Sequence, residues 1–137
     1  MLHAANRGGP NGRYQLEAAI QSAHTARRLD GRSNWSVVVK LYDHLLELTR
    51  SPVVVLNRAV ALAEIEGPAA ALDAIAPLAY DKRMFGYQPY WAARGHLLAR
   101  TGRRSEATEA FTVAVGLSTD DAVRAYLQSW LAALRDA

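Results

Sequence analysis

The chain contains no cysteine, and its 137 residues carry a net charge of only +3. Without cysteine there is neither a disulfide framework nor a thiolate metal site, and a reducing cytosol is the simplest location. The small charge excess, 16 basic against 13 acidic residues, is weak support for nucleic-acid binding. We therefore expect a cytoplasmic protein, with little support for nucleic acid as its partner.

Long apolar runs are also missing. No stretch approaches the roughly 20 apolar residues of a membrane-spanning helix. The most apolar segment, residues 51–63, is interrupted by Asn57 and Arg58. The first seven residues lack the long apolar region of a secretory signal. An apolar content of 50% is nevertheless enough for the core of one domain.

Residue patterns that carry catalytic chemistry are scarce. The four histidines show no pair at the spacing of a metal site: His3, His24, His44 and His96. The glycines at positions 8–12 are not preceded by a strand, so they do not form a phosphate-binding loop. We expect no enzymatic activity, no metal and no cofactor.

Turn-forming residues divide the chain into expected helices. Residues 1–12 are rich in glycine and predict a flexible lead-in, and residues 13–137 predict a single helical domain. Within that domain, apolar residues recur at helical intervals in the expected helices. These helices cover residues 14–24, 35–48, about 51–66 and 69–79, followed by a helix pair within residues 90–117 and a last helix that ends at Leu134. The composition and the pattern together predict an all-α protein.

Short motifs predict where several helices begin. Ser33 or Asn34 can cap the helix that starts at Trp35, because a side-chain oxygen accepts a free backbone amide there. Ser51 caps the next helix in the same way, and the proline that follows suits the first helical turn.

Other residue types mark the helix boundaries further along the chain. Gly67 and Pro68 end one helix and open the next. Ser118, followed three residues later by Asp121, predicts a capping box for the last helix. The linker at residues 80–89 is longer than the other turns, and we expect its aromatic residues to be buried.

Residues 90–117 contain the most informative pattern. Six positions follow the spacing of a tetratricopeptide helix pair: Trp91, Gly95, Leu98, Ala107, Phe111 and Ala114. A glycine inside a helix costs about 1 kcal/mol relative to alanine, so Gly95 predicts that a second backbone comes close. An ordinary helical hairpin is the alternative interpretation.

A weaker copy of this spacing lies 36 residues earlier, between Val55 and Leu78. The first two expected helices resemble a third, more degenerate unit. The sequence therefore predicts a tetratricopeptide-like stack of about three helix pairs with a C-terminal capping helix.

Three longer strings carry a family resemblance. They are Gly12-Arg13-Tyr14-Gln15-Leu16-Glu17-Ala18-Ala19-Ile20-Gln21-Ser22-Ala23-His24, then Asn34-Trp35 with Leu41-Tyr42-Asp43-His44-Leu45-Leu46, and Ser51-Pro52-Val53-Val54-Val55-Leu56-Asn57-Arg58-Ala59-Val60-Ala61. The chain resembles the C-terminal extension of bacterial extracytoplasmic-function (ECF) RNA polymerase sigma factors. Those proteins carry sigma regions 2 and 4 ahead of a tetratricopeptide-like domain, and the resemblance covers nearly the whole chain.

The resemblance implies a regulatory role without direct promoter binding. This chain contains neither the helix-turn-helix of region 4 nor the promoter-melting region 2. It would act on the parent sigma factor through contacts with sigma regions 2 and 4, with the RNA polymerase core or with a signalling partner. One family segment, typically Asp-Leu-Leu-Arg-Arg-Leu-Gly-Arg, reads His96-Leu97-Leu98-Ala99-Arg100-Thr101-Gly102-Arg103 here and departs at His96, Ala99 and Thr101.

Five residues are candidates for partner binding: Asn57, Arg58, His96, Arg100 and Arg103. The repeat register places His96 and Arg100 on an inner helix, with Asn57 and Arg58 near the previous one. For Arg100 and Arg103 the alternative interpretation is a solvated helix end that compensates the helix dipole. Asn57 and Arg58 form a polar pair inside an apolar run and need hydrogen-bond partners if they are buried. The alternative interpretation is that Asn57 bridges to a neighbouring helix and that Arg58 extends to water.

Two further functions stay open at this point. A free-standing tetratricopeptide adaptor would bind peptide segments of unrelated proteins. Nucleic-acid binding through Arg27, Arg28, Arg32 and the Arg100 cluster would depend steeply on salt. The sequence also allows a homodimer.

Overall fold

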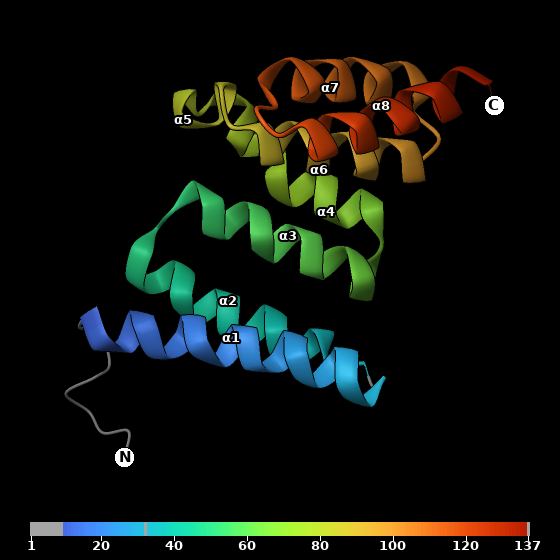
Figure 1. The fold of residues 1–137 in the computed structure, drawn as a ribbon. Coiled ribbons are helices and arrows are strands. Elements are labelled where there is room, and N and C mark those ends of the chain that lie inside the picture. The colour runs from blue at the N-terminus through green and yellow to red at the C-terminus, as the bar shows by residue number, and fades with distance from the viewer. Residues whose placement is uncertain (1–9, 32, 137) are drawn as a thin grey trace. The chain divides into compact units, whose positions relative to one another are not determined.

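The computed structural model describes residues 10–31 and 33–136, and this part of the chain contains helices and no strand (Figure 1). The prediction of an all-α fold is confirmed. Contacts divide the chain into two compact units, residues 1–65 and residues 66–137. The predicted lead-in falls mostly outside the described residues, although residues 10–12 belong to the first helix. The single domain over residues 13–137 stays a prediction.

The first unit consists of three helices: α1 (Pro10–Asp30), α2 (Trp35–Thr49) and α3 (Pro52–Glu66). Helices α1 and α2 lie side by side as a hairpin (Figure 1). Each helix contributes one buried residue to a shared core, namely Ile20, Leu45 and Val54. These residues come from the apolar stripes that the helical period predicts.

The turn between α1 and α2 is held by a side chain with an unexpected role. Asn34 occupies the cap position of α2 but makes no side-chain cap hydrogen bond. Its amide instead donates to the carbonyl oxygen of Ala23 at 2.7 Å, which ties the start of α2 to α1. The prediction that Asn34 caps α2 through its side chain is therefore wrong.

The other early boundaries follow the sequence signals. The Ser51 hydroxyl accepts the backbone N–H of Val53 at 3.2 Å, as a capping serine does. Helix α3 ends at Glu66, and Gly67 adopts φ +94°, which an L side chain rarely tolerates. The predicted pairing of the third and fourth helices spans the boundary between the two units and stays a prediction.

The second unit begins with α4 (Pro68–Ile75), a 3₁₀ helix η2 (Ala76–Tyr80) and the short α5 (Lys82–Phe85). The predicted helix at residues 69–79 is thus interrupted. Pro77 has no N–H to continue the α-helical bonding, so the chain changes to 3₁₀ geometry at Ala76.

The aromatic residues of the 80–89 linker are not buried as expected. Tyr80 is 88% exposed and Phe85 is 53% exposed. The linker is instead held by Met84, which is buried, and by Trp91, whose indole N–H donates to the carbonyl oxygen of Phe85 at 3.0 Å.

Helices α6 (Gln88–Arg100) and α7 (Arg104–Leu117) form the hairpin that the tetratricopeptide spacing predicts. Five of the six pattern positions are buried and Trp91 is half-buried. A Cβ atom on Gly95 would lie 2.8 Å from Cδ1 of Phe111. Gly95 therefore makes room for the Phe111 ring, and the close approach of a second backbone stays a prediction.

Helix α8 (Asp121–Asp136) packs along α7. Leu127 joins Phe111 and Ala114 in one buried cluster, while Leu134 packs against the cluster that contains Ala107. Because Leu127 meets the later part of α7 and Leu134 the earlier part, the two helices are antiparallel.

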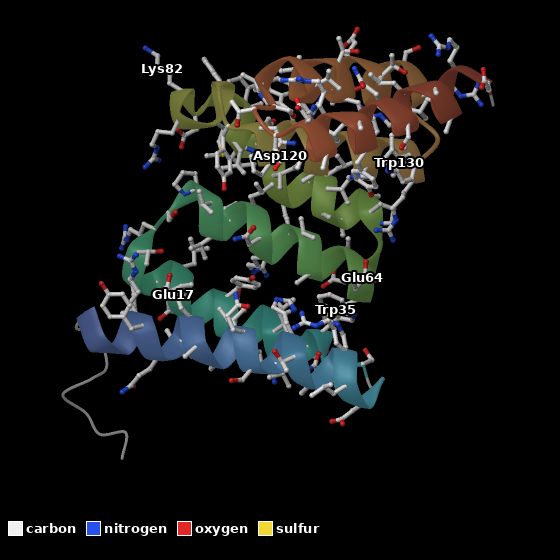
Figure 2. The ribbon with its side chains drawn as sticks, in the orientation of Figure 1. Glu17, Trp35, Glu64, Lys82, Asp120 and Trp130 are labelled. Carbon is white, nitrogen blue, oxygen red and sulfur yellow. The ribbon has the colours of Figure 1, made fainter. Side chains whose placement is uncertain are left out.

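The cap of α8 differs from the prediction. Asp120, labelled in Figure 2 at the start of the helix, accepts the backbone N–H groups of Ala122 and Val123 at 2.8 and 3.0 Å. Ser118 donates its hydroxyl to the carbonyl oxygen of Ala114 and is buried. The prediction of a capping box at Ser118 is therefore wrong, and Asp120, one residue before the helix, caps it instead.

Candidate functional site

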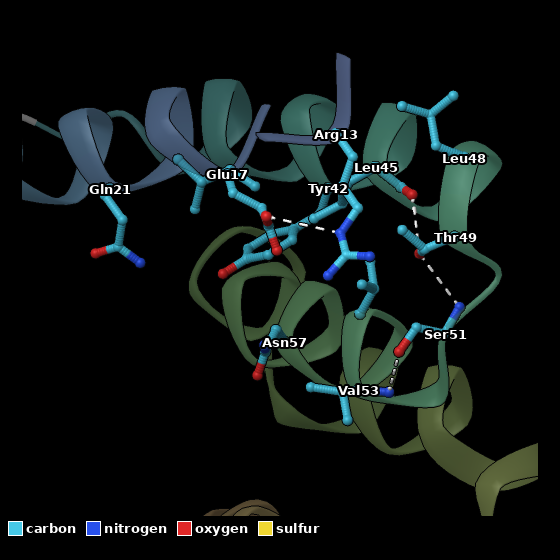
Figure 3. Close-up of a pocket in the computed structure, with 12 residues that line it drawn as sticks. Arg13, Glu17, Gln21, Tyr42, Leu45, Leu48, Thr49, Ser51, Val53 and Asn57 are labelled. Carbon is cyan, nitrogen blue, oxygen red and sulfur yellow. Dashed lines mark hydrogen bonds and ion pairs between the residues drawn. The ribbon is translucent and has the colours of Figure 1, made fainter. Parts of the chain in front are cut away.

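An open groove of about 700 Å³ lies in the first unit between α1, α2 and the start of α3 (Figure 3). Its floor is apolar, because the core residues Ile20, Leu45 and Val54 reach it. Its other lining residues are mostly polar: Arg13, Glu17, Gln21, Tyr42, Leu48, Thr49, Ser51, Val53 and Asn57. The groove thus offers apolar contact below and hydrogen-bonding groups above.

Helix α1 forms one side of this groove and contributes an ion pair to it. Nε of Arg13 lies 3.7 Å from Oε1 of Glu17, one helical turn away, and both side chains are about half exposed. Exposed pairs of this kind contribute little to stability. Both groups can therefore turn to a ligand at small cost.

The opposite end of the groove is ordered by hydroxyl groups. Thr49 donates to the carbonyl oxygen of Leu45 at 3.0 Å and accepts the backbone N–H of Ser51 at 3.3 Å (Figure 3). Since Ser51 in turn caps α3, this chain of hydrogen bonds holds the start of α3 against the end of α2.

Tyr42 and Asn57 supply neutral polar groups. Tyr42 is half-buried, and its burial raises the pKa of the phenol above its ordinary value. Its hydroxyl is a neutral donor and acceptor at neutral pH. Asn57 is exposed, so its amide is free of any burial cost in this position. Asn57 lines the groove, and its role in binding a partner stays a prediction.

Arg58 points to a different neighbour. Its Nε lies 2.5 Å from Oδ1 of Asp43, so the ion pair joins α3 to α2. The side chain is 30% exposed. The alternative interpretation that Arg58 simply extends to water is wrong, because it pairs with a carboxylate on the neighbouring helix.

The remaining three predicted residues belong to the second unit. His96 on α6 is half-buried, with its ring centroid 5.0 Å from that of Phe111 and 4.9 Å from that of Trp130, both edge to face. Burial lowers the pKa of His96. His96 therefore packs α6 against α7 and α8 in this structure.

The two predicted arginines lie at the turn that follows. Arg100 is exposed at the end of α6. Arg103 donates from Nε and Nη2 to the two carboxylate oxygens of Glu106, at 2.9 and 2.8 Å. The five predicted residues are thus divided between the two units, and their role toward a partner stays a prediction.

Of the polar residues that line the groove, sequence reasoning predicted only Asn57 as a binding residue and missed Arg13, Glu17, Gln21, Tyr42, Thr49 and Ser51. The spacing of Arg13 and Glu17 is a sequence signal for a pair on one helix face. No local signal relates either of them to Asn57, because the groove exists only once three helices have packed together.

Two features are absent from the described residues. No group of three or more histidine, aspartate or glutamate residues in this part of the chain is arranged to hold a metal ion. None of the helices formed by residues 10–31 and 33–136 is long and apolar enough to cross a membrane.

Comparison with known proteins found one bacterial relative. The chain is 40% identical over 131 residues to an uncharacterized protein of Rhizobium meliloti, a match that covers 96% of this chain and 30% of the relative. The chain therefore spans less than a third of the length of that protein. No family model matches, and no solved structure matches.

Proposed function

We propose that this chain is the regulatory protein-interaction domain of an ECF sigma factor, and that it binds sigma region 2, sigma region 4 or the RNA polymerase core. The three strings that resemble such extensions support the family. The match to part of a longer bacterial protein is consistent with a module that occurs within larger chains. The helical hairpins are consistent with a protein-binding scaffold.

One observation favours the groove of the first unit as the binding surface. The groove of the first unit is built from the same three strings that carry the resemblance: Glu17 and Gln21 belong to the first, Tyr42 to the second and Asn57 to the third. An apolar floor with a polar rim is the usual anatomy of a protein–protein interface. The floor would supply affinity and the rim would orient the partner.

Binding measurements with separate partners test this proposal. The purified chain is mixed with RNA polymerase core, with a sigma region 2 fragment and with a sigma region 4 fragment, each from the source genome. We expect at least one of the three to bind. Replacing Asn57→Lys places a long charged side chain in the groove and should weaken that binding about tenfold or more, a loss of about 1.4 kcal/mol.

Val60→Lys is the matched control. Val60 lies on the same helix, is 45% exposed and does not line the groove. It should leave binding within about twofold of the unchanged chain. Failure to bind any of the three partners, or equal losses for the two lysine variants, would contradict the proposal.

The genomic sequence gives an independent check. An in-frame sigma region 2 and region 4 upstream of Met1 supports the sigma-factor role. A stop codon followed by a ribosome-binding site directly before Met1 would instead favour a free-standing adaptor. The same groove, with its uncharged amide and phenol groups, suits a peptide segment in that case.

A further inference from the structure

A cluster of four side chains joins the end of α1 to the start of α2. His24 and Arg27 belong to α1, and Asn34 and Trp35 lie where α2 begins. All four residues are half-buried. We call this group the α1–α2 turn cluster. None of its members lines the groove of the first unit.

Arg27 contacts the other three members of the cluster. Its guanidinium carbon lies 3.7 Å from the centre of the Trp35 ring, and tryptophan is the aromatic ring that attracts a cation most strongly. Its Nη1 donates to Oδ1 of Asn34 at 3.4 Å, while the amide of Asn34 is itself tied to α1 through Ala23. Arg27 therefore holds the start of α2 against α1.

The third contact of Arg27 requires a neutral imidazole. Nη2 of Arg27 lies 2.9 Å from Nδ1 of His24, whose ring meets the Trp35 ring edge to face at 6.0 Å. A guanidinium only donates hydrogen bonds, so Nδ1 must accept and the ring hydrogen must lie on Nε2. A protonated His24 carries a hydrogen on Nδ1 as well, and two donors would then face each other. The hydrogen bond is therefore available only to the neutral ring.

The charges around His24 also favour the neutral ring. Burial lowers the pKa of His24, followed by the positive charges of Arg27 and Arg28 on the same helix. Figure 2 labels Glu64 near the end of α3, at the same end of the first unit as the cluster. Neither Glu64 nor Asp30, the last residue of α1, is among the groups that shift this pKa. Protonation of His24 thus adds a positive charge beside two that are already there.

We propose that the α1–α2 turn cluster is a pH-sensitive latch, which neutral His24 keeps closed and protonated His24 opens. A proton from solvent binds Nδ1, so Arg27 loses its acceptor, is repelled by the new charge and leaves Trp35 and Asn34. Because the open turn binds the proton more readily, the latch is closed above about pH 6.5 and opens as pH falls toward the lowered pKa. The inference does not rest on the sigma-factor assignment.

The position of the ring hydrogen tests the first step on the unchanged chain. Nitrogen chemical shifts of the His24 imidazole are measured by nuclear magnetic resonance at about pH 8, where the ring is neutral. We expect the hydrogen on Nε2 and none on Nδ1. A hydrogen on Nδ1 at this pH would overturn the inference, because Arg27 could not then donate to that atom.

Two arginine variants separate the contact from the general positive charge. Arg27→Met removes the donor and the charge but keeps an unbranched side chain, and it should raise the pKa of His24 in a resonance titration. Arg28→Met is the matched control, since it removes one charge from the same part of α1, where Arg28 donates to Thr25. It should raise the pKa less. Equal rises in the two variants, or no rise for Arg27→Met, would contradict the latch.

Amide hydrogen exchange measures the opening of the turn. The reporters are the backbone N–H groups of Gly31 and Val38, which donate to the carbonyl oxygens of Arg27 and Asn34. His24→Gln is the reference at each pH, because its amide oxygen can still accept from Arg27 but binds no proton. Relative to this reference, exchange in the unchanged chain should become about tenfold faster between about pH 7.5 and 5.5, the scale of one lost hydrogen bond to a charged group.

Two further histidine variants complete the test. His24→Lys places a permanent positive charge beside Arg27 and should give fast exchange at both pH values. His44→Gln is the matched control, because His44 is exposed on α2 in the same unit, and it should behave as the unchanged chain does. The inference fails if His24→Gln accelerates in acid as much as the unchanged chain, if His24→Lys stays protected, or if His44→Gln abolishes the acceleration.

Discussion

Gly95 shows how one residue position limits the packing of the second unit. A Cβ atom there would meet the Phe111 ring at 2.8 to 3.0 Å, and Phe111 is fully buried, so the ring has little room to move. The glycine is a requirement of side-chain packing. This packing requirement also explains why glycine, which has an unfavourable helix propensity, is found inside α6.

Gly95→Ala should therefore destabilise the chain. Overpacking costs about 1–3 kcal/mol, and the better helix propensity of alanine returns about 1 kcal/mol. We expect a net loss of about 1 kcal/mol in the free energy of unfolding, measured by urea titration. Gly116→Ala is the control, since nothing lies within 4 Å of its added Cβ, and it should stabilise by about 0.5 kcal/mol. A stabilising Gly95→Ala would contradict the packing argument.

The stability of the second unit depends on pH through His96. Its ring is surrounded by Phe111, Trp130 and Tyr126, and burial lowers its pKa from 6.5. The folded state thus favours the neutral ring. The unfolded chain binds the proton more readily, so the stabilising contribution of the neutral ring is present above about pH 6.5 and is lost as pH falls toward the lowered pKa.

His96→Phe should flatten this pH dependence. The free energy of unfolding of the unchanged chain should fall between about pH 7.5 and 5.5, and the variant should fall less, because phenylalanine binds no proton. His24 in the first unit also has a lowered pKa, caused by burial and then by Arg27 and Arg28, so His24→Gln is measured alongside. The His96 argument fails if only the His24 variant changes the slope.

At the scale of the elements, the start of α8 depends on a single carboxylate. Asp120 accepts two backbone N–H groups that would otherwise lack a partner. Asp120→Ala should lower the free energy of unfolding by about 1 kcal/mol. Asp121→Ala, which removes only an exposed pair with Arg124, should cost clearly less. Equal losses in thermal melts would assign the effect to charge and not to capping.

The helix boundaries also show which features neighbouring residues in the sequence can predict and which they cannot. The boundaries at Ser51 and Gly67 were predictable because a cap and a positive φ depend on residues next to one another in the chain. The roles of Asn34 and Ser118 were not, since each side chain bonds to a carbonyl on a preceding helix that competes with its cap position. The exposure of Tyr80 likewise depends on how the linker folds around Met84 and Trp91.

At the scale of the whole chain, the division into two units predicts separable stability. Gly95→Ala should speed amide hydrogen exchange in α6, α7 and α8 and leave exchange in α1 and α2 unchanged, because the substitution acts within the second unit. Mass spectrometry of exchanged fragments measures this directly. Equal acceleration throughout the chain would instead support the single domain over residues 13–137 that the sequence predicts.

The helical class, most helix boundaries and the apolar face of each helix follow from the order of the amino acids. Period, capping and turn residues act over a few positions, so they can be read along the chain. Three features are visible only in the folded chain: Phe111 covers Gly95, Asp43 pairs with Arg58, and Tyr42 and Asn57 line the same groove. These contacts join residues on different helices, and their energy depends on distances that packing alone sets.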